Sequence, residues 1–185
     1  MKKIICFFSL LMTVLLLVGC ASDGTDWGTV ELARRDAETD ATIPAQHVAV
    51  ALSPNAPLGG MEIIFSITGE SPSGTVSIYK AEKDYDTTLS GKPVRKESFS
   101  PLTEKVLWQF RTLPAGDYLI VFSDLNAATL VRSIVPSDGA NGKILHYRNG
   151  EIMTDGTCAL TLLCIKTDDV PEPNLNTFAY PVPEE

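Results

Sequence analysis

Four cysteines and two histidines are the side chains of this sequence best suited to covalent modification, metal binding or proton transfer. A zinc site needs three or four ligands at sensible spacing, and no such cluster surrounds His47 or His146. The sequence also has no Gly-x-Ser-x-Gly nucleophile elbow and no phosphate-binding glycine loop. We therefore expect no metal, no cofactor and no enzymatic activity. Two carboxylates that folding brings together remain an open alternative, because they need no sequence spacing.

Cys158 and Cys164 lie at the two ends of an apolar run that has the pattern of a strand. Six extended steps of about 3.3 Å would separate them by about 20 Å. A disulfide needs Cα atoms within about 7 Å of each other. We therefore expect two small buried side chains on one strand face, and intermolecular pairing is the alternative.

The chain begins with Met1, Lys2 and Lys3, followed by an apolar stretch from Ile4 to Val18. This charged-then-apolar order is typical of a secretory leader. A membrane-spanning helix needs about 20 apolar residues, and this stretch is shorter. Residues 1–19 are therefore predicted to be a leader rather than a membrane span.

The tetrapeptide Leu17-Val18-Gly19-Cys20 resembles the lipobox of bacterial lipoproteins. The resemblance implies that the Cys20 thiol carries a diacylglyceryl group, that the leader is cut before Cys20, and that the new amine is acylated. Two or three acyl chains hold a protein durably at a membrane, whereas one chain binds marginally. An ordinary leader with a chance cysteine is the alternative, but an A-x-A cleavage site needs a small residue where Leu17 stands.

The residues after Cys20 bear on which membrane holds the chain. Ala21 stands where an aspartate retains enterobacterial lipoproteins at the inner membrane, so the resemblance implies the outer membrane. The stretch Ser22–Asp26 is similar to a diluted form of the acidic segment of surface-exported lipoproteins of Bacteroidota. That similarity implies exposure at the cell surface.

The composition limits the classes of partner. The formal net charge is -8, and removal of Lys2 and Lys3 with the leader makes the remaining chain more acidic. A nucleic-acid site requires clustered Lys and Arg, which this sequence lacks. We expect a self-repelling surface and no nucleic-acid partner.

Short runs of alternating apolar residues recur between Gly, Pro, Asn and Asp, which is the pattern of an all-β protein. Met61–Ile67 places alternate side chains on one face, and Thr75–Lys80 is expected to pair back against it as a hairpin. Ala81–Pro93 is polar and is predicted to be a surface loop. Val106, Trp108 and Phe110 alternate with the residues between them, which predicts that Trp108 lies on the apolar side, in the core. Tyr118–Phe122 is predicted to be a central strand covered on both faces.

The sequence divides into four segments. Residues 1–19 form the leader, and residues 20–45 form a lipidated acidic tether, of which Trp27–Leu32 is either a part or a first strand. Residues 46–169 form the β domain. Residues 170–185 form a proline-rich extended tail that cannot supply a central strand. Its apolar side chains are expected to pack against the β domain.

The segment Leu113-Pro114-Ala115-Gly116-Asp117-Tyr118 resembles the corner of transthyretin-like and carboxypeptidase-regulatory-like β-sandwiches. Pro114 and Gly116 suit a tight turn between sheets, and the Tyr118 hydroxyl can reach the backbone. The same corner occurs in fimbrillin-like lipoproteins of Bacteroidota. The resemblance implies an antiparallel Greek-key β-sandwich.

Two functions follow as expectations. Fimbrillin-like pilins are cut after an arginine to open a groove for a neighbour's strand, so Arg34 and Arg35 are candidate cleavage sites in a structural, adhesive or fimbria-accessory protein that binds protein subunits by strand pairing. The alternative is that the two arginines only balance charge in an acidic segment, which is the commoner role of such a pair. The alternative function is carbohydrate or other ligand binding, with Trp27, Tyr85 or Tyr147 stacking on sugar faces.

Overall fold

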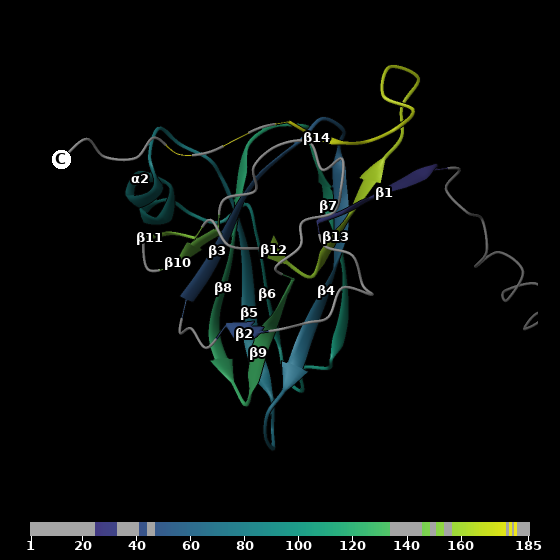
Figure 1. The fold of residues 1–185 in the computed structure, drawn as a ribbon. Helices are drawn as coiled ribbons and strands as arrows, with labels where there is room; N and C mark the ends of the chain where they lie inside the picture. Colours follow the sequence, from purple (N-terminus) through teal and green to yellow (C-terminus); the bar gives the residue numbers. More distant parts are fainter. Residues whose placement is uncertain are drawn as a thin grey trace, which may run out of the picture.

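The computed structural model describes residues 25–32, 41–43, 47–133, 146–148, 151–153, 157–176, 178 and 180. The fold is all-β: two antiparallel sheets pack face to face as a β-sandwich (Figure 1), which confirms the predicted fold class. The first sheet contains β1 (Trp27–Glu31), β13 (Leu160–Ile165), β4 (Leu58–Ile67), β9 (Ala128–Ser133), β12 (Thr157–Cys158), β2 (Ala41–Ile43) and β7 (Lys105–Leu113). The second sheet contains β11 (Glu151–Met153), β10 (His146–Arg148), β3 (His47–Pro54), β8 (Tyr118–Asn126), β5 (Ser73–Lys80), β6 (Arg95–Phe99) and β14 (Leu175–Asn176).

The main core lies between the two sheets and follows from the alternation along their strands. Met61, Ile63 and Phe65 of β4 are all buried, as the sequence pattern predicted. Phe65 meets Phe122 of the second sheet edge to face, with ring centroids 6.4 Å apart. Trp108 of β7 is also buried, which confirms its predicted place in the core.

The first part of strand β8, residues 118–122, is buried on both faces, because apolar layers cover it from either side. Ile120 and Phe122 belong to the core between the sheets. Leu119 and Val121 point the other way, into a second cluster that includes Tyr147 and Tyr180. The prediction of a doubly covered central strand is therefore confirmed.

The corner between β7 and β8 carries the chain from the first sheet to the second. The Tyr118 hydroxyl donates a hydrogen bond to the Pro114 carbonyl oxygen at 2.6 Å. Gly116 has a φ of +146°, a conformation that side chains disfavour, and its N–H donates to the Pro54 carbonyl at 3.2 Å. The buried Leu113 fills the corner from inside.

Strand β5 does not pair with β4, so the predicted hairpin is wrong. Both edges of β4 are already occupied: β13 and β9 pair with one edge, and β7 pairs with the other. The chain therefore crosses to the second sheet, where β5 pairs with β8 and β6. A tight turn in the sequence did not distinguish a hairpin from a crossing between sheets.

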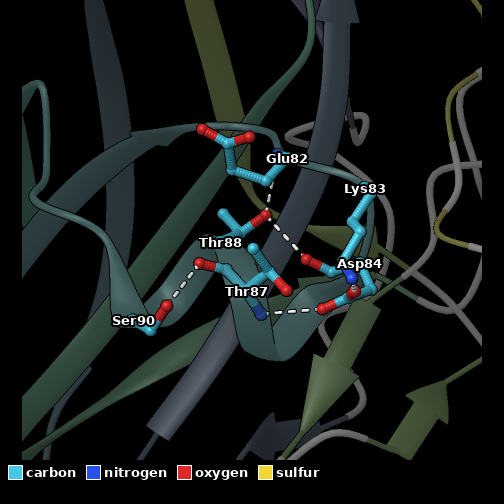
Figure 2. A network of polar contacts seen from close by, with 6 residues as sticks. All are labelled: Glu82, Lys83, Asp84, Thr87, Thr88 and Ser90. Atoms are coloured by element: carbon cyan, nitrogen blue, oxygen red, sulfur yellow. Dashed lines mark hydrogen bonds and ion pairs between the residues drawn. The ribbon is translucent and has the colours of Figure 1, made fainter.

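The segment predicted as a surface loop contains a short helix, α2 (Tyr85–Ser90). The Asp84 carboxylate caps it by accepting a hydrogen bond from the Thr87 N–H at 2.7 Å, and the Ser90 hydroxyl donates to the Thr87 carbonyl (Figure 2). Tyr85 and Leu89, four residues apart, pack against the second cluster. Because this segment is mostly polar, its sequence pattern did not predict the short amphipathic helix.

Both ends of the described chain join the sandwich. Residues 27–31 and 41–43, from the stretch expected to be a tether, are strands of the first sheet. In the tail, β14 pairs with β3, and Leu175 and Tyr180 are buried. Strands β10 and β11 pair with Arg148 opposite Glu151, the register of a hairpin with a two-residue turn.

Candidate functional site beside strand β1

Strand β1 forms an edge of the first sheet. It pairs antiparallel with β13 from Trp27 opposite Ile165 to Glu31 opposite Thr161. Two further backbone bonds extend this ladder: Leu32 N–H donates to the Leu160 carbonyl at 2.9 Å, and Lys166 N–H donates to the Asp26 carbonyl at 2.8 Å. Among the described strands, β13 is the only partner of β1.

Side chains also hold β1 in place. Leu32 is completely buried in the core, and Val30 packs against it. Gly28 is buried where the tail crosses the strand, since a Cβ there would lie 2.8 Å from Pro173. The N-terminal strand is therefore fixed by apolar side chains on the inside of the sandwich and by the C-terminal segment on the outside.

A break in strand register lies next to β1. On β4 and β7, Leu58 pairs with Leu113 but Gly60 pairs with Gln109, so Gly59 alone faces three residues of β7. The pairing of β13 with β4 shifts at the same place. Such bulges redirect side chains and often lie beside functional sites. A pocket of about 460 Å³ opens here, with walls from β1, β4, β7 and the end of β13.

The indole of Trp27 forms one wall of this pocket. The residue is 40% exposed, and the six-membered end of its ring lies against Gly59. A Cβ at position 59 would lie 2.5 Å from Cη2 of Trp27, so the absence of a side chain at Gly59 makes room for the indole. Of the three predicted stacking residues, Trp27 lines this pocket.

The remaining lining of the pocket is mixed, with the apolar side chains of Phe110 and Ile165 beside several polar ones. Gln109, Arg111 and Thr112 of β7 and Thr25 all contribute to it. Arg95 donates two hydrogen bonds to the Arg111 carbonyl, from Nε at 3.0 Å and Nη2 at 2.6 Å, and so fixes the backbone there. The described lining contains no carboxylate, imidazole or thiol. Its residues can stack, donate and accept hydrogen bonds, and attract an anion.

Tyr85 and Tyr147 lie elsewhere, on the outer face of the second sheet. Their rings stack with centroids 5.2 Å apart, and Tyr147 is only 2% exposed. The Tyr147 hydroxyl accepts a hydrogen bond from the Tyr180 N–H at 2.8 Å, and burial raises the pKa of Tyr147. These rings pack the tail onto the sheet rather than presenting a surface to a ligand.

Cys158 and Cys164 are both buried in the core and form no disulfide. Burial raises the pKa of the Cys164 thiol to about 11. The run that contains them divides at Ala159 into β12 and β13, which pair with β9 and β4 respectively. Their expected role as small buried side chains agrees with this packing.

The remaining predicted site residues, Leu17, Val18, Gly19, Cys20, Arg34 and Arg35, lie outside the described residues. Within the described residues, no group of three or more His, Cys, Asp or Glu side chains is arranged to hold a metal ion. The same part of the chain contains no helix with the length and apolarity to cross a membrane.

Sequence comparison adds no assignment: no protein family and no curated protein matches this chain. Sequence reasoning also missed most of the pocket, including Gly59, Gln109 and Arg111. The available signal was the pair Gly59-Gly60 inside an otherwise apolar strand pattern, which indicates a bulge or a close backbone approach.

Proposed function

We propose that this chain is a lipid-anchored, non-catalytic protein of the bacterial cell envelope that assembles with other subunits by exchange of strand β1. The lipobox-like segment ending at Cys20 supports the anchor and the outer-membrane location. The corner Leu113–Tyr118, similar to that of fimbrillin-like lipoproteins, supports a fimbria-accessory or adhesive role.

The place of β1 in the chain is the observation that carries this proposal. The strand ends just before Arg34 and Arg35 in the sequence, and it occupies an edge of the first sheet. A cut after either arginine would leave β1 held by non-covalent contacts alone, chiefly its ladder to β13, the buried Leu32 and the tail that crosses it at Gly28. Its departure would expose the β13 edge and a leucine-sized gap in the core. A neighbour's strand with an apolar residue at the matching position could fill both.

Limited trypsin treatment of the detergent-solubilised full chain tests the exchange. We expect mass spectrometry to find cleavage after Arg34 or Arg35. A fluorescent peptide copying residues 25–32 should then bind the cut protein, with a rise in anisotropy, and should not bind the uncut protein. Cut protein that takes up no peptide after extended incubation would contradict the proposal.

Two controls make this experiment specific. The double variant Arg34→Gln/Arg35→Gln should resist the cut in this segment and should not bind the peptide. A peptide in which Leu32 is replaced by Asp should not bind the cut protein, because a carboxylate would have to enter the apolar core. If the native peptide and the Leu32→Asp peptide bound equally well, the binding would not occur at the position that β1 leaves.

The lipid anchor is tested separately. The native protein should fractionate with membranes, and its N-terminal peptide should begin at Cys20 with the mass of attached acyl chains. Cys20→Ala should remove both properties while the sandwich still folds. An unmodified N-terminus, or a leader still attached, would end the lipoprotein proposal without affecting strand exchange.

A further inference from the structure

We propose that the pocket beside Trp27 binds an acidic saccharide, a sugar unit that carries a carboxylate. This inference is independent of strand exchange, and it concerns the intact protein with β1 in place. It rests on three features of the pocket: an exposed indole, polar side chains that both donate and accept, and an arginine that has no ion pair with any residue the structure describes.

The indole supplies a platform for a sugar ring. The C–H groups of a pyranose form an apolar face, and a large aromatic ring buries that face with little loss of conformational freedom. Contact with Gly59 positions the Trp27 ring at the pocket, and the residue remains 40% exposed to solvent. A pocket of about 460 Å³ lies within the size range of small-ligand sites.

The polar lining matches the hydroxyl groups of a sugar. An amide such as that of Gln109 offers donors and an acceptor, and the hydroxyls of Thr25 and Thr112 do both. Gln109 and Thr112 are exposed side chains of β7, carried to the pocket by the register break at Gly59. Sugar hydroxyl groups that lose their hydrogen bonds to water on binding can therefore form hydrogen bonds to these side chains.

Arg111 favours a ligand with a negative charge. Its planar guanidinium binds a carboxylate through two parallel hydrogen bonds, a geometry that lysine does not provide. Within the described residues Arg111 forms no salt bridge, whereas the nearby Lys166 is paired with Asp26 at 3.5 Å. The net charge of -8 repels anions at long range, but salt screens that repulsion beyond about 8 Å and leaves the contact with Arg111 dominant.

Calorimetry with the uncut, detergent-solubilised full chain tests the proposal. The probes are digalacturonate, the neutral digalactose of the same linkage, and a tetraglutamate peptide. We expect digalacturonate to bind at least about tenfold more tightly than either of the other probes. Digalactose lacks the carboxylate that pairs with Arg111, and tetraglutamate lacks the sugar ring that stacks on Trp27.

Three variants locate the binding. Arg111→Gln should weaken digalacturonate binding at least about tenfold and remove the preference over digalactose. Trp27→Ala should weaken the binding of both sugars. Lys105→Gln, an exposed cation on the same strand but outside the pocket, should leave the affinity unchanged.

Three results would overturn the proposal. The first is no heat of binding with digalacturonate at millimolar concentration. The second is binding that Arg111→Gln leaves unchanged. The third is a tetraglutamate affinity equal to that of digalacturonate, which would identify the pocket as a site for acidic peptides. Because β1 remains attached throughout, none of these results bears on strand exchange.

Discussion

The Tyr180 hydroxyl lies 2.8 Å from Oγ1 of Thr88, a buried hydrogen bond that joins the tail to helix α2. The Thr88 hydroxyl donates to the Asp84 carbonyl at 2.8 Å and accepts from the Glu82 N–H at 2.9 Å (Figure 2). A threonine hydroxyl has one hydrogen and two lone pairs, so Tyr180 must be the donor in the third contact. Every hydrogen-bonding position of this buried hydroxyl is therefore used.

Removal of either partner in this contact should destabilise the fold. Tyr180→Phe should lower the free energy of unfolding by about 1 kcal/mol. Thr88→Val should lower it by more, because it leaves the Glu82 N–H without its acceptor and removes one of the two donors to the Asp84 carbonyl. The double variant should cost less than the sum of the two, which urea unfolding can measure. Strict additivity would mean that the two hydroxyls do not interact.

The corner bond of Tyr118 should also contribute to stability. Tyr118→Phe removes the donor to the Pro114 carbonyl and should lower the free energy of unfolding by about 1 kcal/mol. Tyr79→Phe is the matched control, because the Tyr79 hydroxyl forms no hydrogen bond within the described residues. Equal losses in the two variants would show that the corner bond has no special role.

Two adjacent glycines should respond differently to the same added methyl group. In Gly59→Ala the new Cβ meets the end of the Trp27 ring, which can swing outward, so we expect a small loss of stability and a changed tryptophan fluorescence. In Gly60→Ala the new Cβ lies 2.8 Å from the Trp108 carbonyl oxygen, which is backbone and cannot move alone. Thermal unfolding should therefore show the larger loss in Gly60→Ala, by about 1–3 kcal/mol.

Alkaline pH should weaken the fold. Burial raises the pKa of Cys164 from 9.0 to about 11 and that of Tyr180 from 10.0 to about 12, so the folded chain holds these protons more tightly than the unfolded chain does. Their stabilising effect is fully present below about pH 9 and is lost as the pH rises toward 11 and 12. Urea unfolding across this range should show the decline. Cys164→Ala should flatten its first part, and an unchanged slope would contradict this assignment.

The buried Leu32 side chain should contribute strongly to the stability of β1 in the sandwich. Leu32→Ala removes a completely buried side chain and should cost about 2–5 kcal/mol. The variant should also be cut by trypsin after Arg34 or Arg35 faster than the parent chain. Leu107→Ala is the control: its side chain is 57% exposed, so neither stability nor cleavage rate should change. A Leu32→Ala variant with parental stability would mean that β1 is not anchored by this residue.

Local patterns in the sequence predicted the elements better than their partners. The alternation in Met61–Ile67 and the burial of Trp108 were predictable, because each depends on which face a side chain occupies along one strand. The pairing of Thr75–Lys80 was not, because it depends on which sheet edges other strands have already filled.

The candidate site was predictable only in part for the same reason. Trp27 could be proposed as a ligand platform from its type, but its contact with Gly59 joins segments far apart in the chain. Tyr147 has the same aromatic character and is buried, because the tail residue Tyr180 covers it. Exposure of an aromatic ring is a property of the assembled fold, and the flanking sequence carries little information about it.

The pairing of β1 with β13 joins a strand near the start of the chain to one near its end. The first sheet cannot be completed until nearly all of the polypeptide is present, and contacts between such distant segments form slowly. During synthesis or translocation, the first sheet would thus remain incomplete until β13 has emerged. Truncation near the C-terminus should then prevent maturation of the N-terminal edge, although the two regions share no neighbouring sequence.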